Sequence, residues 1–174
     1  TAWDLGIGDA TSIWFAQRVG QEIHLIDHYE SSGQDLAHYV GFLKSKPYSY
    51  QGHIVPHDAQ ARELGTGKSR LEVLESLGLR NVRVAPRHSV EDGINAVRVL
   101  LPKCWFDIIK CARGIEALTL YRAEWNEKLG TIQSRPVHDW TSHAADAFRY
   151  LAMTDITGRN NFNRKLIYPK SGVA

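Results

Sequence analysis

Residues 136–151 read Pro-Val-His-Asp-Trp-Thr-Ser-His-Ala-Ala-Asp-Ala-Phe-Arg-Tyr-Leu, and this stretch decides the fold. Pro136 favours an extended lead-in. Thr141 or Ser142 can then cap the first amides of a helix, and the residues that follow are mostly good helix formers. We therefore predict a turn, a cap and an apolar helix with Asp146 in its first two turns. A carboxylate there can stabilise the positive end of the helix or bind a metal ion.

The composition is that of one ordinary globular domain. The chain has 174 residues, of which 43% are hydrophobic and 23% are charged, so it can bury a core. The net charge of +2 lacks the strong basicity typical of nucleic-acid binding, although a local basic surface is compatible with it. Cys104 and Cys111 show no CxxC spacing, and we expect reduced, buried or partly buried thiols in a cytosolic setting. No apolar run reaches the roughly 18 residues of a membrane span.

Three short apolar runs separated by tight turns open the chain and predict an antiparallel meander over 2–7, 11–19 and 22–29. Helices and strands then alternate, which predicts an α/β domain whose mixed sheet has three antiparallel strands followed by parallel strands, with flanking helices. The later elements expected are helices over 35–46, 69–77, 89–101 and 113–128, strands over 52–58 and 81–85, and extended segments over 106–109 and 131–137. We expect residues 1–157 to form the domain and 158–174 a basic, flexible tail.

Three carboxylates lie at the ends of three separate elements. Asp4 belongs to the first strand, Asp58 ends the strand after Pro56, and Asp146 begins the last helix. Three clustered carboxylates repel one another unless a divalent cation neutralises them, and oxygen ligands favour Mg²⁺ or Mn²⁺ over zinc. Two such ions about 4 Å apart can drive phosphodiester hydrolysis. Turn formation and helix capping are the alternative role of each aspartate, and spacing alone does not decide between them.

The same segments resemble a known family. Asp4-Leu-Gly-Ile-Gly-Asp-Ala-Thr11, the strand that ends in Pro56-His-Asp58, and the Pro136–Tyr150 motif together look like the nuclease domain of tailed-bacteriophage large terminase subunits, within the RNase H-like superfamily. The resemblance extends from the first strand to about residue 155, and the last motif is its most specific part. It implies an RNase H-like fold and metal-dependent cutting of concatemeric double-stranded viral DNA during genome packaging.

The resemblance also implies a site. The three acidic residues of the family match Asp4, Asp58 and Asp146, which would be catalytic and hold two Mg²⁺ or Mn²⁺ ions. Asp9 is a candidate outer ligand. His143 lies one helical turn before Asp146 and is a candidate ligand, orienting group or cap. His57 and His138 show no HExxH or CxxC pattern, so we do not expect zinc.

The loop after Asp58 carries two further signals. Gly65-Thr-Gly-Lys-Ser69 resembles the end of a phosphate-binding loop, but the full pattern needs glycine where Arg62 stands, so we do not expect nucleotide binding. Arg62, Lys68 and Arg70 are candidate contacts to DNA phosphates; a solvated loop is the equal alternative. Elsewhere, six aromatic residues at apolar positions are expected in the core: Trp14, Tyr39, Trp105, Tyr121, Trp125 and Tyr150.

The function expected is therefore a DNA endonuclease domain of a viral packaging terminase with low sequence specificity. By resemblance its partners would be double-stranded DNA, an ATPase domain of the same polypeptide that lies outside this chain, the portal and the small terminase subunit. It would act in the cytoplasm of an infected bacterial host, with no membrane association. Two alternatives remain: another RNase H-like nuclease of the resolvase or transposase type, and a non-catalytic domain that docks on DNA or the portal.

Overall fold

The computed structural model describes residues 1–6, 9–126 and 130–154, and most of them surround one mixed β-sheet. Its strands are β1 (Ala2–Asp4), β2 (Ala10–Val19), β3 (Glu22–Ser32), β4 (His53–Val55), β5 (Val82–Val84) and β6 (Cys104–Phe106). The strand order in the sheet is β5-β4-β1-β2-β3-β6. The pairs β1–β2 and β2–β3 are antiparallel, and the pairs β1–β4, β4–β5 and β3–β6 are parallel. The predicted α/β class and mixed sheet are confirmed.

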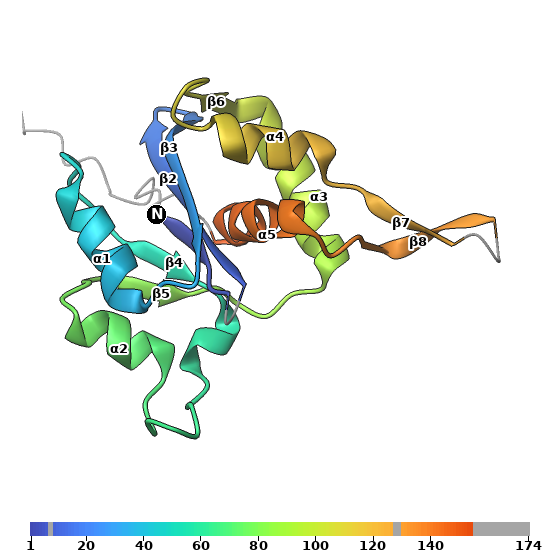
Figure 1. The fold of residues 1–174 in the computed structure, drawn as a ribbon. Coiled ribbons are helices and arrows are strands. Elements are labelled where there is room, and N and C mark those ends of the chain that lie inside the picture. Colours follow the sequence, from blue (N-terminus) through green and yellow to red (C-terminus); the bar gives the residue numbers. More distant parts are fainter. Residues whose placement is uncertain (7–8, 127–129, 155–174) are drawn as a thin grey trace, which may run out of the picture.

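Helices cover both faces of this sheet (Figure 1). On one side lie α1 (Leu36–Ser45) and α2 (Arg70–Ser76), and on the other lie α3 (Val90–Leu100), α4 (Ala112–Leu120) and α5 (Trp140–Met153). Two short 3-10 turns, η1 (His57–Gln60) and η2 (Leu101–Lys103), follow β4 and α3. We call the two sides of the sheet the α1 face and the α5 face. Within the described part of the chain, no helix is long and apolar enough to cross a membrane.

The two faces bury different cores because successive residues of a strand point to opposite sides. The core of the α1 face consists mostly of large side chains, which include Trp3, Phe15, Tyr39, Leu43 and Leu74. The core of the α5 face combines Trp14 and Phe148 with small residues of α5. Fully buried alanines let α5 approach the sheet, so that the Trp14 indole N–H donates to the Ala144 carbonyl at 2.8 Å.

Helix α5 begins slightly earlier than the sequence suggests. Asp139, and not Thr141 or Ser142, is the N-cap, and its side chain accepts from the Thr141 amide. Aspartate is as good a cap as serine and its charge favours the helix N-terminus. The consequence is that Asp146 lies on the second turn of the helix, as expected.

The largest error in the predicted elements concerns residues 113–128. Helix α4 ends at Leu120, and the chain continues as β7 (Ala123–Asn126), which pairs with β8 (Thr131–Pro136) in an antiparallel hairpin that projects from the body (Figure 1). Pairing with β8 therefore overrides a helical pattern. The extended segment expected over 106–109 is found two residues earlier, as β6 (Cys104–Phe106). Residues 107–110 instead form a turn, in which the Asp107 side chain accepts hydrogen bonds from the Ile109 and Lys110 amides.

Two of the predicted core aromatics lie on the surface. Trp105 on the edge strand β6 is 62% exposed and Trp125 in the hairpin is 57% exposed. Both belong to strands with one unprotected side, which periodicity does not reveal. Cys104 is half-buried and Cys111 is buried, and both are free thiols as predicted. The tail predicted at 158–174 lies outside the described residues.

Candidate active site

The three predicted carboxylates come from three elements, β1, η1 and α5. Asp4 is the last residue of β1 and Asp146 lies in α5. Asp58 does not end its strand as predicted, because β4 stops at Val55 and the chain turns at Pro56 into η1, which carries Asp58. A proline cannot donate to the ladder, so the strand ends before it. The structure therefore places all three on the same side of the molecule, at the ends of β1 and β4 and on α5.

Besides burial, the charges of all three carboxylates raise the pKa of one tyrosine of α5. Burial, with the charges of all three carboxylates added, raises the pKa of the Tyr150 hydroxyl to about 12. Burial also raises the pKa of Asp4, and the neighbouring charge of Asp146 raises it further, against a hydrogen bond from His143 that lowers it. Side chains more than 50 residues apart in sequence thus share one electrostatic environment.

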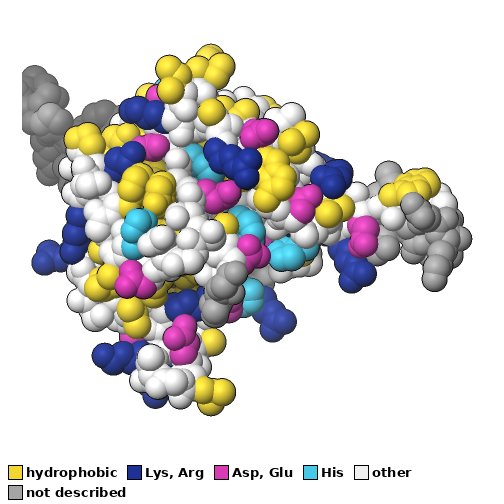
Figure 2. All heavy atoms as spheres, viewed as in Figure 1, with side chains coloured by type: hydrophobic (Ala, Val, Ile, Leu, Met, Phe, Trp, Pro, Cys, Tyr) yellow, Lys and Arg dark blue, Asp and Glu magenta, His cyan; other side chains and the backbone are white. Residues whose placement is uncertain are grey.

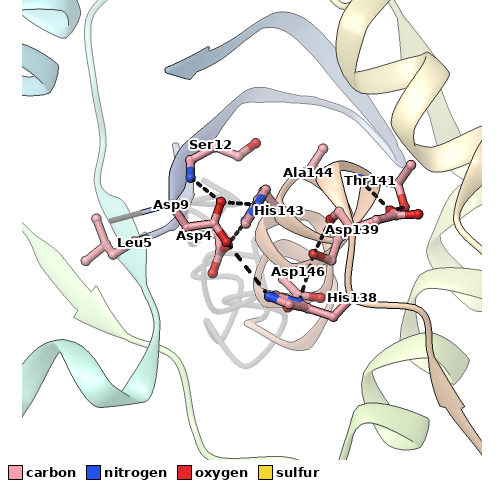
Figure 3. Close-up of polar contacts among 12 residues, drawn as sticks. Asp4, Leu5, Asp9, Ser12, His138, Asp139, Thr141, His143, Ala144 and Asp146 are labelled. Carbon is pink, nitrogen blue, oxygen red and sulfur yellow. Dashed lines mark hydrogen bonds and ion pairs between the residues drawn. The ribbon is translucent and has the colours of Figure 1, made fainter. Parts of the chain in front are cut away.

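His143 bridges two of the acidic residues (Figure 3). Its Nδ1 lies 3.4 Å from Asp4 Oδ2, and its Nε2 lies 3.0 Å from Asp9 Oδ1. The side chain is only 8% exposed. The hydrogen bond to Asp4 and the charge of Asp9 outweigh burial and raise the pKa of His143. The predicted proximity of His143 to the site is therefore present, but its contacts are to Asp4 and Asp9.

A tight approach of the backbone holds Asp9 in place. A Cβ on Gly6 would lie 2.4 Å from the Ala10 carbonyl oxygen, which is closer than real atoms approach. Only glycine therefore fits two residues after Asp4, where the chain leaves β1 and returns in β2. The Asp9 carboxylate also accepts the Ala10 amide at 2.9 Å.

Arg70 links Asp58 to the end of β1. Its guanidinium donates to the Leu5 carbonyl at 3.0 Å and to Asp58 Oδ2 at 3.4 Å, and its side chain is only 12% exposed. This arginine of α2 joins η1 to the residue that follows β1, and its predicted contact with DNA stays a prediction. Arg62 and Lys68 lie on the exposed loop between η1 and α2, and their predicted role in binding phosphate stays a prediction.

Asp146 is paired within its own helix. Arg149 donates to Asp146 Oδ1 from Nε at 3.1 Å and also from Nη2, an i,i+3 arrangement on one helix face. Burial opposes the charge on Arg149, yet its contact with Asp146 raises the pKa of the guanidinium. The i,i+3 spacing of Asp146 and Arg149 could have indicated this pair from the sequence, but we did not predict it. Tyr150 was expected only as a core residue, and its acidic neighbours were not expected.

Each predicted carboxylate therefore has a positively charged or protonatable neighbour inside the protein. Among residues 1–6, 9–126 and 130–154, no three His, Cys, Asp or Glu side chains are arranged to hold a metal ion. The donor chemistry nevertheless fits a hard divalent cation, because the converging groups are carboxylate oxygens. The space-filling view shows histidine and acidic side chains gathered in the middle of this face (Figure 2).

Comparison with known proteins identifies the fold. No family model matches the sequence, and no curated protein matches it. Among solved structures, the nuclease domain of the bacteriophage SPP1 large terminase, described with bound Mn, matches with a TM-score of 0.64 and 18% identity over 86% of this chain and 81% of its own. The bacteriophage P22 large terminase nuclease domain matches with a TM-score of 0.62 and 22% identity over 87% of this chain and 78% of its own.

A longer structure gives the same result. The large terminase from a thermophilic bacteriophage matches with a TM-score of 0.66 and 20% identity over 88% of this chain. This chain covers only 39% of that protein's length. The expected resemblance to terminase nuclease domains is confirmed at the level of the fold.

Proposed function

We propose that this chain is a metal-dependent DNA endonuclease domain of a viral packaging terminase. The observation that carries the proposal is the placement of three aspartates: Asp4 ends β1, Asp58 follows the parallel neighbour β4 in η1, and Asp146 lies in α5. The fold shared with terminase nuclease domains supports it, as does the Mn described in one of them. The substrate would be concatemeric double-stranded DNA, cut with low sequence specificity because phosphate contacts carry no sequence information directly.

The three aspartates would hold two Mg²⁺ or Mn²⁺ ions, which when bound would activate water and stabilise the leaving oxygen. The surrounding residues position the acids. His143 fixes Asp4 and Asp9 relative to α5. Arg70 fixes Asp58 relative to Leu5, and Arg149 fixes Asp146. On the exposed loop, Arg62 and Lys68 would bind the DNA backbone as point charges.

The proposal extends to the setting of the whole protein. The domain would work with an ATPase domain of the same polypeptide, the portal and the small terminase subunit, in the cytoplasm of the infected host. This inference rests on large terminases being longer than the present chain and on the resemblance of its motifs to theirs.

Plasmid cutting in Mn²⁺ or Mg²⁺ tests the activity. Asp4→Asn, Asp58→Asn and Asp146→Asn should each reduce cutting at least about 100-fold while the circular dichroism spectrum is retained, since each removes a proposed ligand. Glu75→Gln, which removes one negative charge from the exposed surface of α2, is the matched control and should cut normally. Undiminished cutting by the Asp4 and Asp146 variants would refute the assignment.

Two other functions give different results in the same assay. A resolvase-type enzyme would prefer branched over linear duplex DNA. A domain that only docks on DNA or the portal would show no divalent-ion binding by calorimetry and no cutting under any condition.

A further inference from the structure

A further acidic residue, Glu30, lies in line with Asp4 across the sheet. In the ladder, Asp4 is opposite Ser12 on β2, and Ser12 is opposite Glu30 on β3. Directly opposed residues of antiparallel strands project from the same face, so the three side chains form a row on the α5 face. Ser12 is fully buried and small, and no bulky side chain of β2 stands between the two acids in this row.

The Glu30 carboxylate is only half partnered. Its Oε1 lies 3.6 Å from Nε of Arg113 on α4, and the side chain is 12% exposed. Its Oε2 is inaccessible to solvent and has no hydrogen-bond partner among the described residues. A buried acceptor without a partner is costly and calls for an explanation such as an ion or an ordered water.

Arg113 has two further partners besides Glu30. Its guanidinium stacks on the Trp140 ring at 3.6 Å from the centroid and also contacts Glu116 Oε2 at 3.3 Å. These contacts tie Arg113 to the start of α5 and to its own helix. They leave Oε2 of Glu30 without a partner among the described residues.

Glu30 also belongs to the electrostatic environment of the site. Burial raises the pKa of Glu30, the charges of Arg113 and His143 lower it, and the charge of Asp4 raises it. Glu30 in turn helps to raise the pKa of His143, after the larger effects of Asp4 and Asp9. Glu30 is not among the residues predicted from the sequence, because the predicted strand ends at Tyr29. In the structure β3 continues to Ser32 and therefore includes Glu30.

We propose that Glu30 is an additional acidic residue of the divalent-cation site, acting beside Asp4 and His143 to bind the ion. The proposal rests on the function proposed above. It assigns the unpartnered oxygen a cation, and it gives β3 a part in a site that otherwise draws on β1, η1 and α5. The competing explanation is that Glu30 serves only as the ion-pair partner of Arg113.

Calorimetric titration with Mn²⁺ separates the two explanations without any cutting assay. Glu30→Gln should weaken Mn²⁺ binding about tenfold, as loss of a supporting carboxylate does at other metal sites. Glu116→Gln removes the other acidic partner of Arg113 and should bind Mn²⁺ like the wild type. Equal Mn²⁺ affinities for Glu30→Gln, Glu116→Gln and the wild type would overturn the proposal.

A second variant predicts a change of opposite sign. Arg113→Gln removes the positive charge beside Glu30 and should tighten Mn²⁺ binding several-fold, and this gain should vanish in the Glu30→Gln, Arg113→Gln double variant. An unchanged affinity in Arg113→Gln, or an equal gain in both backgrounds, would overturn the proposal. This pair also decides the matter if Glu30→Gln alone fails to fold.

The outcomes also distinguish this inference from the proposed function. Loss of Mn²⁺ binding in Asp4→Asn together with normal binding in Glu30→Gln would overturn only the role of Glu30. A wild-type protein that binds no Mn²⁺ would overturn the proposed function, and the role of Glu30 with it.

Discussion

The two faces of the central sheet are built from alternate residues of the same strands, yet they differ in chemistry. On the α1 face, Trp3 of β1 and Ile13 of β2 are opposite each other and pack with Phe15 and the helices in an apolar cluster. On the α5 face, the next pair along is Asp4 and Ser12. The comparison shows that both layers bury apolar side chains, and that β1 and β2 also present polar groups to the α5 layer near their shared end.

The largest expected effect tests the apolar face. Leu43 of α1 is 1% exposed, and Leu43→Ala should lower the free energy of unfolding by about 2–5 kcal/mol through lost burial and a cavity. Urea denaturation measures this, with Leu64→Ala as the matched control because Leu64 is fully exposed. If the two variants were equally stable, Leu43 would not contribute to the stability of the α1 face.

Acid should destabilise the protein through one buried histidine from each side of the sheet. Burial lowers the pKa of His28, which faces α5, and of His53, which packs on Trp3, to about 4 in both cases. Both are neutral when folded, whereas the unfolded chain takes up protons near pH 6.5. Stability should therefore be fully present above about pH 6.5 and fall as the pH decreases towards 4, by at most about 3 kcal/mol for each histidine.

Urea midpoints measured between pH 7 and pH 4.5 check this dependence. His28→Gln should remove about one proton from the slope of unfolding free energy against pH, and leave the contribution of His53. An unchanged slope would show that His28 is protonated in the folded protein.

Glycines of the two helical layers should respond in opposite directions. A Cβ on Gly114 of α4 would lie 2.3 Å from the Trp14 ring, so Gly114→Ala should cost about 1–3 kcal/mol by overpacking. A Cβ on Gly41 of α1 would meet nothing within 4 Å, and Gly41→Ala should stabilise by roughly 0.4–1 kcal/mol. Thermal unfolding of the pair measures the difference, and a shift of the same sign in both would contradict the packing described for α4.

The smallest stability effect is expected at the site itself. Burial raises the pKa of Asp4, so its ionised form does not favour folding, and Asp4→Asn should leave the melting temperature unchanged or higher. The same variant should lose Mn²⁺ binding. A marked fall in melting temperature would instead assign Asp4 a structural role.

Much of the fold follows from the sequence because its signals are local. The helix expected over 89–101 is α3, which Ser89 caps by accepting from the Asp92 amide, and the first three strands lie where apolar runs and turns place them. The predicted helix over 113–128 failed because the β7–β8 pairing depends on residues that come later in the chain. Helix propensity is a weak signal when a tertiary partner exists.

Motif resemblance selects candidate acids but not their partners. The structure places Asp4 at the end of β1, Asp58 in η1 and Asp146 in α5, and their role as metal ligands stays a prediction. Their neighbours depend on contacts between distant elements, such as the bond from Arg70 to the Leu5 carbonyl. Sequence separation of 65 residues leaves no local trace of such a contact.

Each of the three aspartates is paired with a basic side chain of the same chain, and this pairing has a consequence for folding and for metal binding. Because Arg149, Arg70 and His143 already balance the carboxylates, the chain needs no ion to fold, and chelators should leave it native. If the proposed divalent ion binds at this site, it must compete with these resident counter-charges, which would lower its apparent affinity. Under the proposed function, DNA cutting would then require a high concentration of free metal ion.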